Sequence, residues 1–315
     1  MYKLKILKQQ IKRFNKNIKT FYRGRYIRAY FQQIYCALRF GTSFDDFFRY
    51  EFYKKSNYER AKYLTYKKSK KIIKNNCKQE LMVFSDKQKF NEKFKAYIKR
   101  EYLVLENATG QELEDFCKKH GSIIMKPIVG SKGNGIFKLN AEEIGKYNIE
   151  NYRDYIAEEL LVQHKSLSKL NPDSVNTIRA LTYKGEIVAC ALRIGGGGSL
   201  VDNFSSGGVC GAIDIDSGIV ISPCIDVALT KYIFHPQTKA KMLGFEVPNW
   251  ERVKQTVIEA SREILSVEYV GWDLAVLENG VAIIEGNGDP GHRIMQMSNQ
   301  QGIYNKILEI KKRKK

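Results

Sequence analysis

Short apolar runs alternate with longer amphipathic stretches from residue 81 onward. This pattern predicts strands over 81–84, 122–127, 136–139, 155–162, 177–183 and 187–194. It predicts helices over 86–99, 111–120 and 250–265, with a hairpin turn at Lys184-Gly-Glu186. Many strands, several hairpins and interspersed helices indicate an α+β fold with mainly antiparallel sheets.

Residues 1–80 follow a different pattern and predict a basic helical region. Apolar positions recur near helical spacing, with lysines on the other side: Leu4, Ile6, Leu7, Ile11, Phe14 and Ile18. Residues 45–53 and the run to 71 predict further helix. The first helix suits peripheral contact with an anionic membrane through residues 1–44. Packing of this helix against the main domain is the competing interpretation, and it is slightly favoured.

The segment 271–287 predicts a strand, a tight turn and a returning strand. If the loop has three residues and Gly280 is left-handed, Leu277 pairs with Val281 and Asp273 falls opposite Glu285. Asn287, two residues on, keeps to the same face. A two-residue loop would put Asp273 and Glu285 on opposite faces.

This hairpin is the strongest candidate for chemistry in the chain. Cross-strand neighbours lie roughly 5 Å apart at Cβ, so two carboxylates and an amide oxygen would converge at a spacing that suits Mg²⁺. The alternative is an amphipathic hairpin whose acids face water. The local sequence favours neither interpretation over the other.

The composition indicates a large core and excludes several classes of protein. The chain has 315 residues, 43% of them hydrophobic, which is enough for two or three subdomains. No apolar run approaches the roughly 20 residues that span a bilayer, and the lysine-rich N-terminus does not resemble a signal peptide. Six scattered cysteines without a C-x-x-C pair argue against a zinc site or a disulfide framework and fit the cytoplasm.

The net charge of +19 is concentrated at the ends of the chain. No acid precedes Asp45, and the chain ends in Lys311-Lys-Arg-Lys-Lys315. Nucleic acid, the inner face of a membrane and anionic substrates are all compatible partners, and a solvated basic surface is the simplest alternative. Because the middle of the chain is closer to neutral, the high net charge is a property of the two ends and not of the core domain.

A glycine-rich loop and two lysines suit the binding of phosphate. Gly130, Gly133 and Gly135 allow backbone N–H groups to approach a phosphate closely, and Lys126 precedes them on a predicted strand. The loop is neither a P-loop nor a dinucleotide fingerprint. Lys87 opens a predicted helix and offers a second cation. A plain turn, a surface lysine and an N-cap at Ser85-Asp86 explain the same residues structurally.

The order of these motifs resembles the ATP-grasp superfamily over residues 81–307. The elements are Asp86-Lys87, Lys126-Pro before the glycine loop, Glu158-Glu-Leu-Leu161, an arginine strand, then Asp273 and Glu285-x-Asn287. Within it, three segments resemble the sugar-transfer-associated ATP-grasp group: Val175-Asn-Thr-Ile-Arg179, Arg193-Ile-Gly195 and Val201-Asp-Asn-Phe-Ser-Ser-Gly-Gly208.

The resemblance implies an ATP-grasp fold, with a small subdomain over 81–158 and a large one over 159–315. ATP would bind between them, with two Mg²⁺ ions or alternatively Mn²⁺. The phosphates would contact Lys87, Lys126, Ser131, Gly133, Asn134 and Gly135, and the adenine would meet the chain around Glu158, Glu159, Leu160 and Leu161. Asp273, Glu285 and Asn287 would hold the metal, and Arg179 would lie near the γ-phosphate. The usual N-terminal Rossmann-like domain is replaced by the basic helices, so the substrate does not follow by analogy.

The leading hypothesis is an ADP-forming ligase acting through an acyl phosphate. Arg179 and Arg193 are candidates to hold a carboxylate or the acyl phosphate, since guanidinium binds such groups bidentately. The predicted acceptor site and its surroundings comprise Asn176, Asp202, Asn203, Ser205, Ser206, His292 and Arg293. The resemblance suggests a glycan precursor and a role in polysaccharide biosynthesis.

Two alternatives stay open from the sequence. A kinase would use the same nucleotide scaffold to phosphorylate a hydroxyl. A basic protein that binds nucleic acid is a third class, but the chain contains no recognisable motif that reads DNA or RNA.

Overall fold

The chain forms two compact units, one of which is built from both ends of the sequence. The computed structural model describes residues 2–130, 133–196, 204 and 207–314. Unit 1 comprises residues 1–75 and 291–315, and unit 2 comprises residues 76–290. Residues 291–315, expected in the large subdomain, therefore group with the N-terminal helices. Among the described residues, no helix combines the length and the hydropathy needed to cross a membrane.

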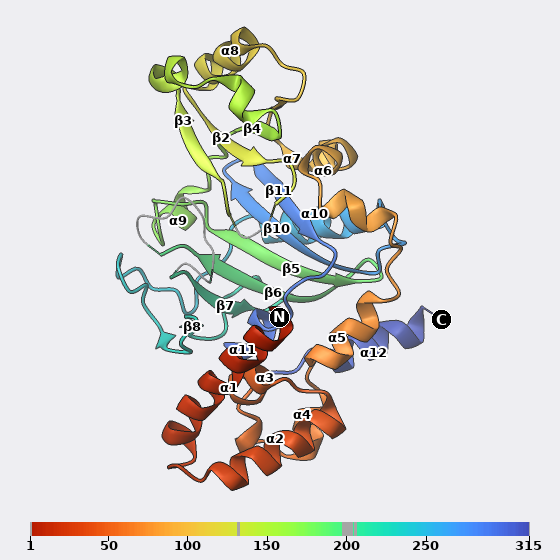
Figure 1. Cartoon of the computed structure of the whole chain (residues 1–315). Helices are drawn as coiled ribbons and strands as arrows, with labels where there is room; N and C mark the ends of the chain where they lie inside the picture. The colour runs from red at the N-terminus through yellow and green to blue at the C-terminus, as the bar shows by residue number, and fades with distance from the viewer. Residues whose placement is uncertain (1, 131–132, 197–203, 205–206, 315) are drawn as a thin grey trace. The chain divides into compact units, whose positions relative to one another are not determined.

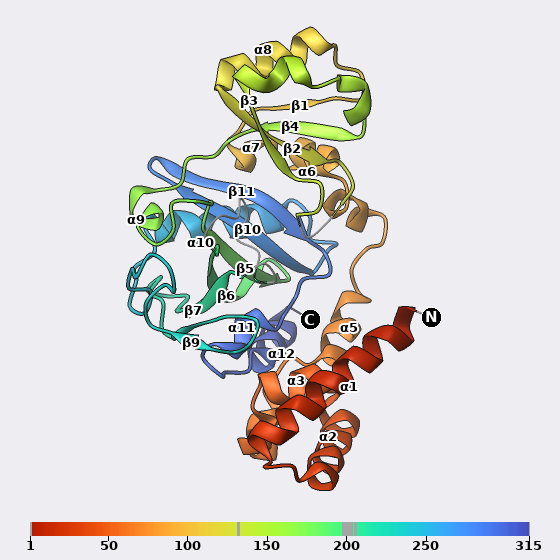
Figure 2. The same ribbon diagram turned by 60° about the vertical axis from the view of Figure 1, so that its left-hand side comes forward.

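Unit 1 is helical (Figure 2). Its elements are α1 (Tyr2–Phe21), α2 (Tyr26–Phe40), α3 (Phe44–Arg49), η1 (Phe52–Lys54), α4 (Asn57–Ala61), α5 (Tyr66–Ile73), α11 (Ile294–Met297) and α12 (Tyr304–Arg313). Phe14 and Ile18 of α1 are buried, and α1 contacts α3. This part of the apolar face of α1 therefore packs inside unit 1.

Aromatic packing and a capping box give unit 1 its core. The ring of Phe14 lies 5.0 Å from those of Phe44 and Phe48, centroid to centroid. Ser43 caps α3 by accepting a hydrogen bond from the backbone of Asp46, whose carboxylate accepts one from the backbone of Ser43 in return. The Asp46 side chain is fully buried and accepts a 2.8 Å hydrogen bond from Arg293. The C-terminal segment is thereby tied to the N-terminal helices.

Unit 2 contains two antiparallel sheets (Figure 1). The four-stranded sheet has the order β1-β4-β2-β3, formed by β1 (Tyr102–Val104), β2 (Ser122–Pro127), β3 (Phe137–Asn140) and β4 (Tyr155–Glu159). The seven-stranded sheet has the order β11-β10-β5-β6-β7-β8-β9, formed by β5 (Thr177–Tyr183), β6 (Glu186–Ile194), β7 (Val209–Ile213), β8 (Cys224–Ile225), β9 (Lys231–Tyr232), β10 (Tyr269–Leu277) and β11 (Gly280–Asn287). The expected antiparallel α+β architecture is confirmed.

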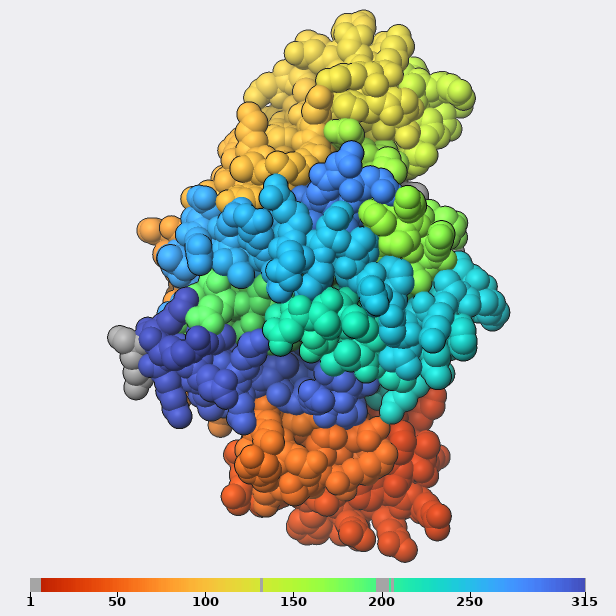
Figure 3. Space-filling view, turned by 180° about the vertical axis from the view of Figure 1, so that it is seen from behind, coloured from red at the N-terminus to blue at the C-terminus, as the bar shows by residue number. Residues whose placement is uncertain are grey.

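Helices flank both sheets. They are η2 (Glu80–Phe84), α6 (Lys87–Lys93), α7 (Lys95–Ile98), α8 (Gly110–His120), η3 (Ala141–Lys146), η4 (Ile149–Tyr152), α9 (Lys165–Ser168) and α10 (Trp250–Arg262). The buried face of α10 packs on the core of the larger sheet, and its polar face forms part of the surface seen in light blue in Figure 3. The helices predicted over 86–99, 111–120 and 250–265 are thus present with shifted ends, and Phe94 interrupts the first.

The strand predicted over 81–84 is wrong, because these residues form the 3₁₀ helix η2. Leu81 and Phe84 pack closely on β11 and the residue after it. A Cβ added at Gly286 would lie 2.6 Å from Phe84, and one at Gly288 would lie 2.2 Å from Leu81. The apolar run is therefore explained by packing onto two glycines, without strand pairing.

Candidate functional site

A cavity of about 900 Å³ lies within unit 2, and most of the predicted site residues line it. Both sheets contribute to its wall. From the smaller sheet come Lys126 and Glu158, and from the larger sheet come Arg179, Arg193, Asp273, Glu285 and Asn287. A cavity of this size suits a small molecule such as a nucleotide.

The 271–287 hairpin brings Asp273 opposite Glu285, as predicted, but not through the predicted turn. Leu277 pairs with Gly280, so the loop has two residues, and Gly280 has φ +157°, outside the left-handed helical region. The predicted Leu277–Val281 pair and left-handed Gly280 are therefore wrong. A bulge at Ile284 adds one residue to β11 and restores the pairing of Asp273 with Glu285.

A row of charged side chains crosses the larger sheet at this point. Asp273 pairs with Arg179 on β5 and with Glu285 on β11, so their side chains share one face. The Asp273 carboxylate accepts hydrogen bonds from Arg179 Nε and, at 2.6 Å, from Arg179 Nη2. Arg193 Nη1 on β6 donates a third, at 3.0 Å. Burial alone would raise the pKa of Asp273, but the charges of Arg179 and Arg193 outweigh it and lower that pKa.

Asp273 and Glu285 both line the cavity, and Glu285 is the more exposed of the two. Asn287 Nδ2 donates to Glu285 Oε1 at 3.3 Å. The surrounding protein atoms desolvate Glu285, and this burial, followed by the charge of Asp273, raises the pKa of Glu285. Two adjacent carboxylates disfavour their simultaneous ionisation, and a cation between them would relieve the repulsion.

These oxygen atoms fit a hard divalent cation. The described residues include no cluster of three His, Cys, Asp or Glu that would hold a metal by themselves. Mg²⁺ is ordinarily held by one or two carboxylates together with substrate phosphates, and a carboxylate has more acceptor sites than the hydrogen bonds of Asp273 use. The hairpin therefore fits a metal that is shared with a phosphate ligand.

Lys126 and Glu158 form the opposite, smaller-sheet side of the cavity. Lys126 Nζ lies 2.5 Å from Glu158 Oε2. Glu158 is buried, and Arg100 and Asn91 donate to its other oxygen at 3.0 and 2.9 Å. Burial would raise the pKa of Glu158, but the charges of Arg100 and Lys126 hold that pKa far below its ordinary value. The acid thus fixes the ammonium of Lys126 at the cavity wall.

Arg100 and Asn91 are site residues that the sequence did not reveal. Arg100 also donates to the carbonyls of Ile283 and Ile284, at 2.7 and 3.1 Å. It therefore connects Glu158 with the bulge that sets the position of Glu285. Asn91 follows Lys87 by one helical turn, a spacing that could have signalled a shared face. No local pattern distinguishes Arg100 from a surface arginine.

Lys87 is held beside the glycine loop. Its Nζ donates to the carbonyl of Pro127 at 2.7 Å and to that of Gly130 at 3.5 Å. Burial, followed by the charge of Lys126, lowers the pKa of Lys87. Gly130 and Gly133 line the cavity, whereas Asn134 and Gly135 are described but lie outside its lining. Ser131 is outside the described residues.

The segment after β4 supplies an apolar part of the cavity wall. Leu160 and Leu161 line it, although the predicted strand 155–162 ends at Glu159. Glu159 also borders the cavity, and its carboxylate accepts a 3.0 Å hydrogen bond from the backbone of Glu101. This hydrogen bond fixes one oxygen of the Glu159 side chain at the edge of the cavity.

Several predicted substrate residues are used elsewhere or are not described. Asn176 is buried, and its Nδ2 donates to Gln163 and to the carbonyls of Leu167 and Asn171, so it organises a loop and does not line the cavity. His292 and Arg293 belong to unit 1, where Arg293 is bound to Asp46. Contact of His292 and Arg293 with a substrate stays a prediction. Asp202, Asn203, Ser205 and Ser206 lie outside the described residues.

A family model for sugar-transfer-associated ATP-grasp proteins matches residues 49–312, most of the chain. The chain belongs to this family. Its fold is accordingly the ATP-grasp fold, with a helical N-terminal region that the match enters at residue 49.

Solved structures of ATP-grasp proteins resemble the chain at low identity. The ligase PsnB, complexed with minimal precursor, Mg and ADP, is 14% identical, with a TM-score of 0.49 over 76% of this chain and 62% of that one. D-cycloserine synthetase DcsG is 10% identical, with a TM-score of 0.46 over 76% and 74%. D-alanine–D-alanine ligase from Bacillus anthracis is 13% identical, with a TM-score of 0.41 over 74% and 70%. The chain spans less than two thirds of the length of PsnB, and no curated protein sequence matches it.

Proposed function

We propose that this ATP-grasp protein is an ATP-dependent, ADP-forming ligase that joins a carboxylate to an amine or a related nucleophile. One observation carries the proposal. The two cations Lys87 and Lys126 and the charged row of Arg193, Arg179, Asp273 and Glu285 line a single cavity. Cations on one side and a carboxylate pair on the other are what a triphosphate with a divalent metal requires.

The residues that line the cavity have roles that follow from their positions. Lys126 and Lys87 bind the phosphates as point charges, and Gly130 and Gly133 let the backbone approach them. Leu160 and Leu161 cover the adenine. Asp273, Glu285 and Asn287 would hold Mg²⁺, as one or two ions, which would neutralise charge on the phosphates.

The proposed reaction has two steps, and neither needs a side-chain nucleophile. A carboxylate oxygen of the substrate attacks the γ-phosphorus of ATP, and the bond between this phosphorus and the bridging oxygen of the β-phosphate breaks. ADP departs, and the substrate becomes an acyl phosphate. The amine then attacks the acyl carbon, and phosphate leaves as the amine loses a proton to solvent. Arg179 and Arg193 orient the carboxylate and balance the charge that develops.

A glycan precursor in the biosynthesis of cell-surface polysaccharide is the proposed source of the carboxylate. The family description, sugar-transfer-associated ATP-grasp, supports this assignment. Uronic acids and amino sugars are the first compounds to screen.

Hydroxylamine trapping tests the ligase proposal against a kinase. The full chain is incubated with ATP, Mg²⁺, hydroxylamine and a panel of carboxylates, and hydroxamate and ADP are measured together. We expect equal amounts of both with the correct carboxylate. If ADP is released with a phosphorylated hydroxyl product and no hydroxamate, the protein is a kinase and the ligase proposal is wrong.

A further inference from the structure

Helix α2 has two apolar faces, and only one of them is covered. Ala29, Gln33, Cys36 and Phe40 are buried inside unit 1. Four residues on the opposite face are largely exposed, with relative exposures of 76, 70, 52 and 79%: Ile27, Phe31, Ile34 and Leu38. At 100° per residue these four positions form a stripe roughly 60° wide along the helix. We refer to them as the α2 stripe.

The α2 stripe is not a poorly packed part of the core. The opposite side of α2 already packs in the aromatic core of unit 1, where the rings of Phe40 and Phe52 lie 6.3 Å apart. Beside the stripe, Tyr30 donates a 2.7 Å hydrogen bond to Asn15 of α1. Contiguous exposed apolar surface of this kind marks an interaction site.

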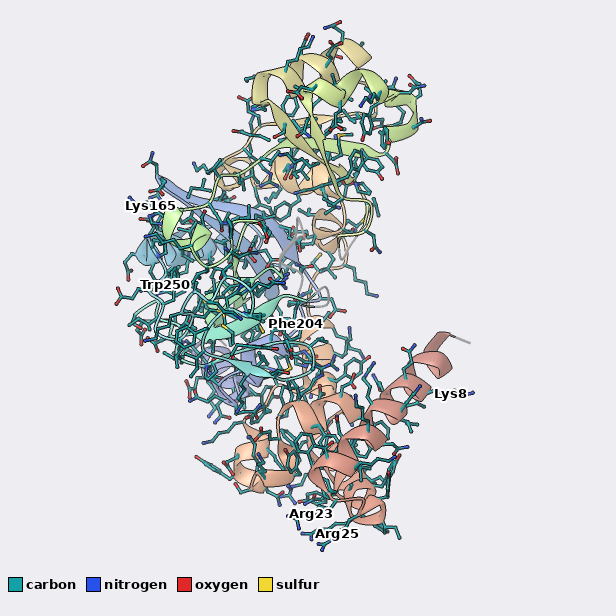
Figure 4. All side chains as sticks on the ribbon, turned by 90° about the vertical axis from the view of Figure 1, so that its left-hand side faces the viewer. Lys8, Arg23, Arg25, Lys165, Phe204 and Trp250 are labelled. Carbon is teal, nitrogen blue, oxygen red and sulfur yellow. The ribbon has the colours of Figure 1, made fainter. Side chains whose placement is uncertain are left out.

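An arginine pocket lies at the beginning of the same helix. This cavity of about 320 Å³ is lined by Phe21, Tyr22, Arg23, Arg25, Arg28, Gln32 and Tyr53. In the described part of the chain, no carboxylate pairs with any of its three arginines. Arg23 has φ +49°, in the left-handed region that arginine seldom adopts, and Gly24 follows at +77°. Figure 4 shows Arg23 and Arg25 at the surface of this turn.

The charge of the surrounding segment identifies the occupant. Residues 1–44 contain eleven Lys and Arg and no acid. Lys8, which projects from α1 in Figure 4, is one of these exposed cations. A second copy of the chain would bring two such basic surfaces together, which like-charge repulsion opposes. Duplex nucleic acid would satisfy the arginines and leave the α2 stripe without apolar contact. A bilayer with anionic headgroups provides both anionic and apolar partners.

The geometry points to a membrane-docking surface on unit 1. The α2 stripe enters the boundary between headgroups and acyl chains, and the arginine pocket binds a lipid phosphate. None of the residues of this surface lines the cavity of unit 2, so this inference stands whether or not the proposed ligase activity is correct.

Vesicle co-sedimentation with the full chain tests the proposal. Vesicles of phosphatidylcholine alone are compared with vesicles that also contain phosphatidylglycerol. We expect binding to the mixed vesicles only, weakening as salt screens the charges. The double variants Phe31→Ser/Leu38→Ser and Arg25→Gln/Arg28→Gln should each bind about tenfold more weakly or worse, from the loss of apolar and basic contributions respectively.

Matched variants in unit 1 control for exposure and charge. Tyr58→Ser removes an apolar side chain that is 73% exposed on α4 and is not part of the stripe. Lys71→Gln/Lys74→Gln removes two exposed cations near the end of α5. Both controls should bind vesicles like the unchanged chain, and far-ultraviolet circular dichroism should give the same helix content for all variants.

Three results would overturn the docking surface. The first is equal binding to both vesicle types, or no loss in either test variant. The second is a dimer in sedimentation velocity that the stripe variant makes monomeric, since the stripe would then bind a second copy. The third is calorimetric binding of inorganic phosphate that needs Arg25 and Arg28 while vesicles are not bound, since the pocket would then take a soluble anion.

Discussion

At the scale of single residues, the two acids of the hairpin have different surroundings although they are paired. Asp273 is buried and is held by Arg179 and Arg193, whereas Glu285 is the more exposed of the two at the cavity wall. We therefore expect the first to contribute to both folding and the proposed activity, and the second chiefly to the proposed activity.

Substitution of the two acids by their amides should separate these contributions. Glu285→Gln should lower Mg-ATP turnover by about a hundredfold or more, because a metal ligand loses its charge, with an unchanged melting temperature. Asp273→Asn should abolish turnover and also destabilise unit 2 by about 3 kcal/mol or more, because two guanidinium groups lose their buried counter-charge. Turnover and thermal unfolding check both. Full activity of the Glu285 variant would refute the metal assignment.

Asp46 gives unit 1 a dependence on pH. Burial would raise the pKa of Asp46, but the charges of Arg293 and His292 outweigh it and lower that pKa. A lowered folded pKa contributes stability above the unfolded value of about 3.9, and this stability disappears as the pH falls through the folded pKa. The difference in unfolding free energy between the unchanged chain and Asp46→Asn should therefore be large at pH 7 and shrink below about pH 4.

Urea unfolding monitored by circular dichroism, repeated at several pH values, checks this dependence. Asp45→Asn is the matched control, because Asp45 forms its ion pair with Arg13, a half-exposed side chain. A constant difference between the unchanged chain and Asp46→Asn at all pH values would contradict the assignment.

At the scale of elements, Arg100 connects α6, β4 and β11. It donates to Glu158, to Asn91 and to the two carbonyls at the bulge of β11. Because Glu285 follows that bulge, Arg100 positions the 271–287 hairpin relative to Lys126, and it makes no hydrogen bond to Asp273 or Glu285 among the described contacts.

Arg100→Met should test this connection while keeping much of the side-chain volume. We expect a loss of about 3–5 kcal/mol in stability, since the variant leaves Glu158 with fewer partners in a buried place. We also expect weaker binding of Mg-ATP, measured by calorimetry at a temperature where the variant is folded. Lys95→Met, an exposed position on α7, should change neither quantity. Unchanged affinity in the Arg100 variant would show that it acts on stability alone.

The sequence predicted elements and their order better than the details of how they pair. The apolar pattern located β2, β5 and β6 closely, because β2 alternates between buried and half-buried positions and β5 and β6 are nearly continuous buried runs. The pairing of Asp273 with Glu285 was predicted correctly, but from a three-residue loop that is not present. The bulge at Ile284 produces the same pairing, and no local signal in the sequence marks it. Arg100 could not be predicted, because the partners that place it in the site, Glu158 and the carbonyls of Ile283 and Ile284, come from distant parts of the chain. The exposed face of α2 likewise appears only once its other face is seen to be buried.

At the scale of the whole molecule, the two ends of the chain together form unit 1. The described C-terminal residues contribute buried side chains to unit 1, among them Gln296, Ile307 and Ile310. Gln296 accepts from the backbone of Leu64 at 2.9 Å and donates to its carbonyl at 3.0 Å.

Removal of residues 291–315 should therefore unfold unit 1. The truncated chain would leave Asp46 buried without Arg293 and would remove part of the core. Far-ultraviolet circular dichroism should show a loss of helix greater than that of the deleted residues themselves, and limited proteolysis should cut within residues 1–75. A truncated chain with these residues protected would contradict the prediction.

Because unit 1 is formed by residues from both ends of the sequence, the two units become complete in a fixed order during synthesis. All of unit 2 is translated between Asn75 and Gly291, which takes on the order of ten to forty seconds at common elongation rates. Throughout that time the N-terminal helices lack Arg293 and the C-terminal core residues. The cavity-bearing unit has all its residues before unit 1 does, so its folding can begin first. The unit with the basic, apolar surface is completed last, when residues 291–315 have been synthesised.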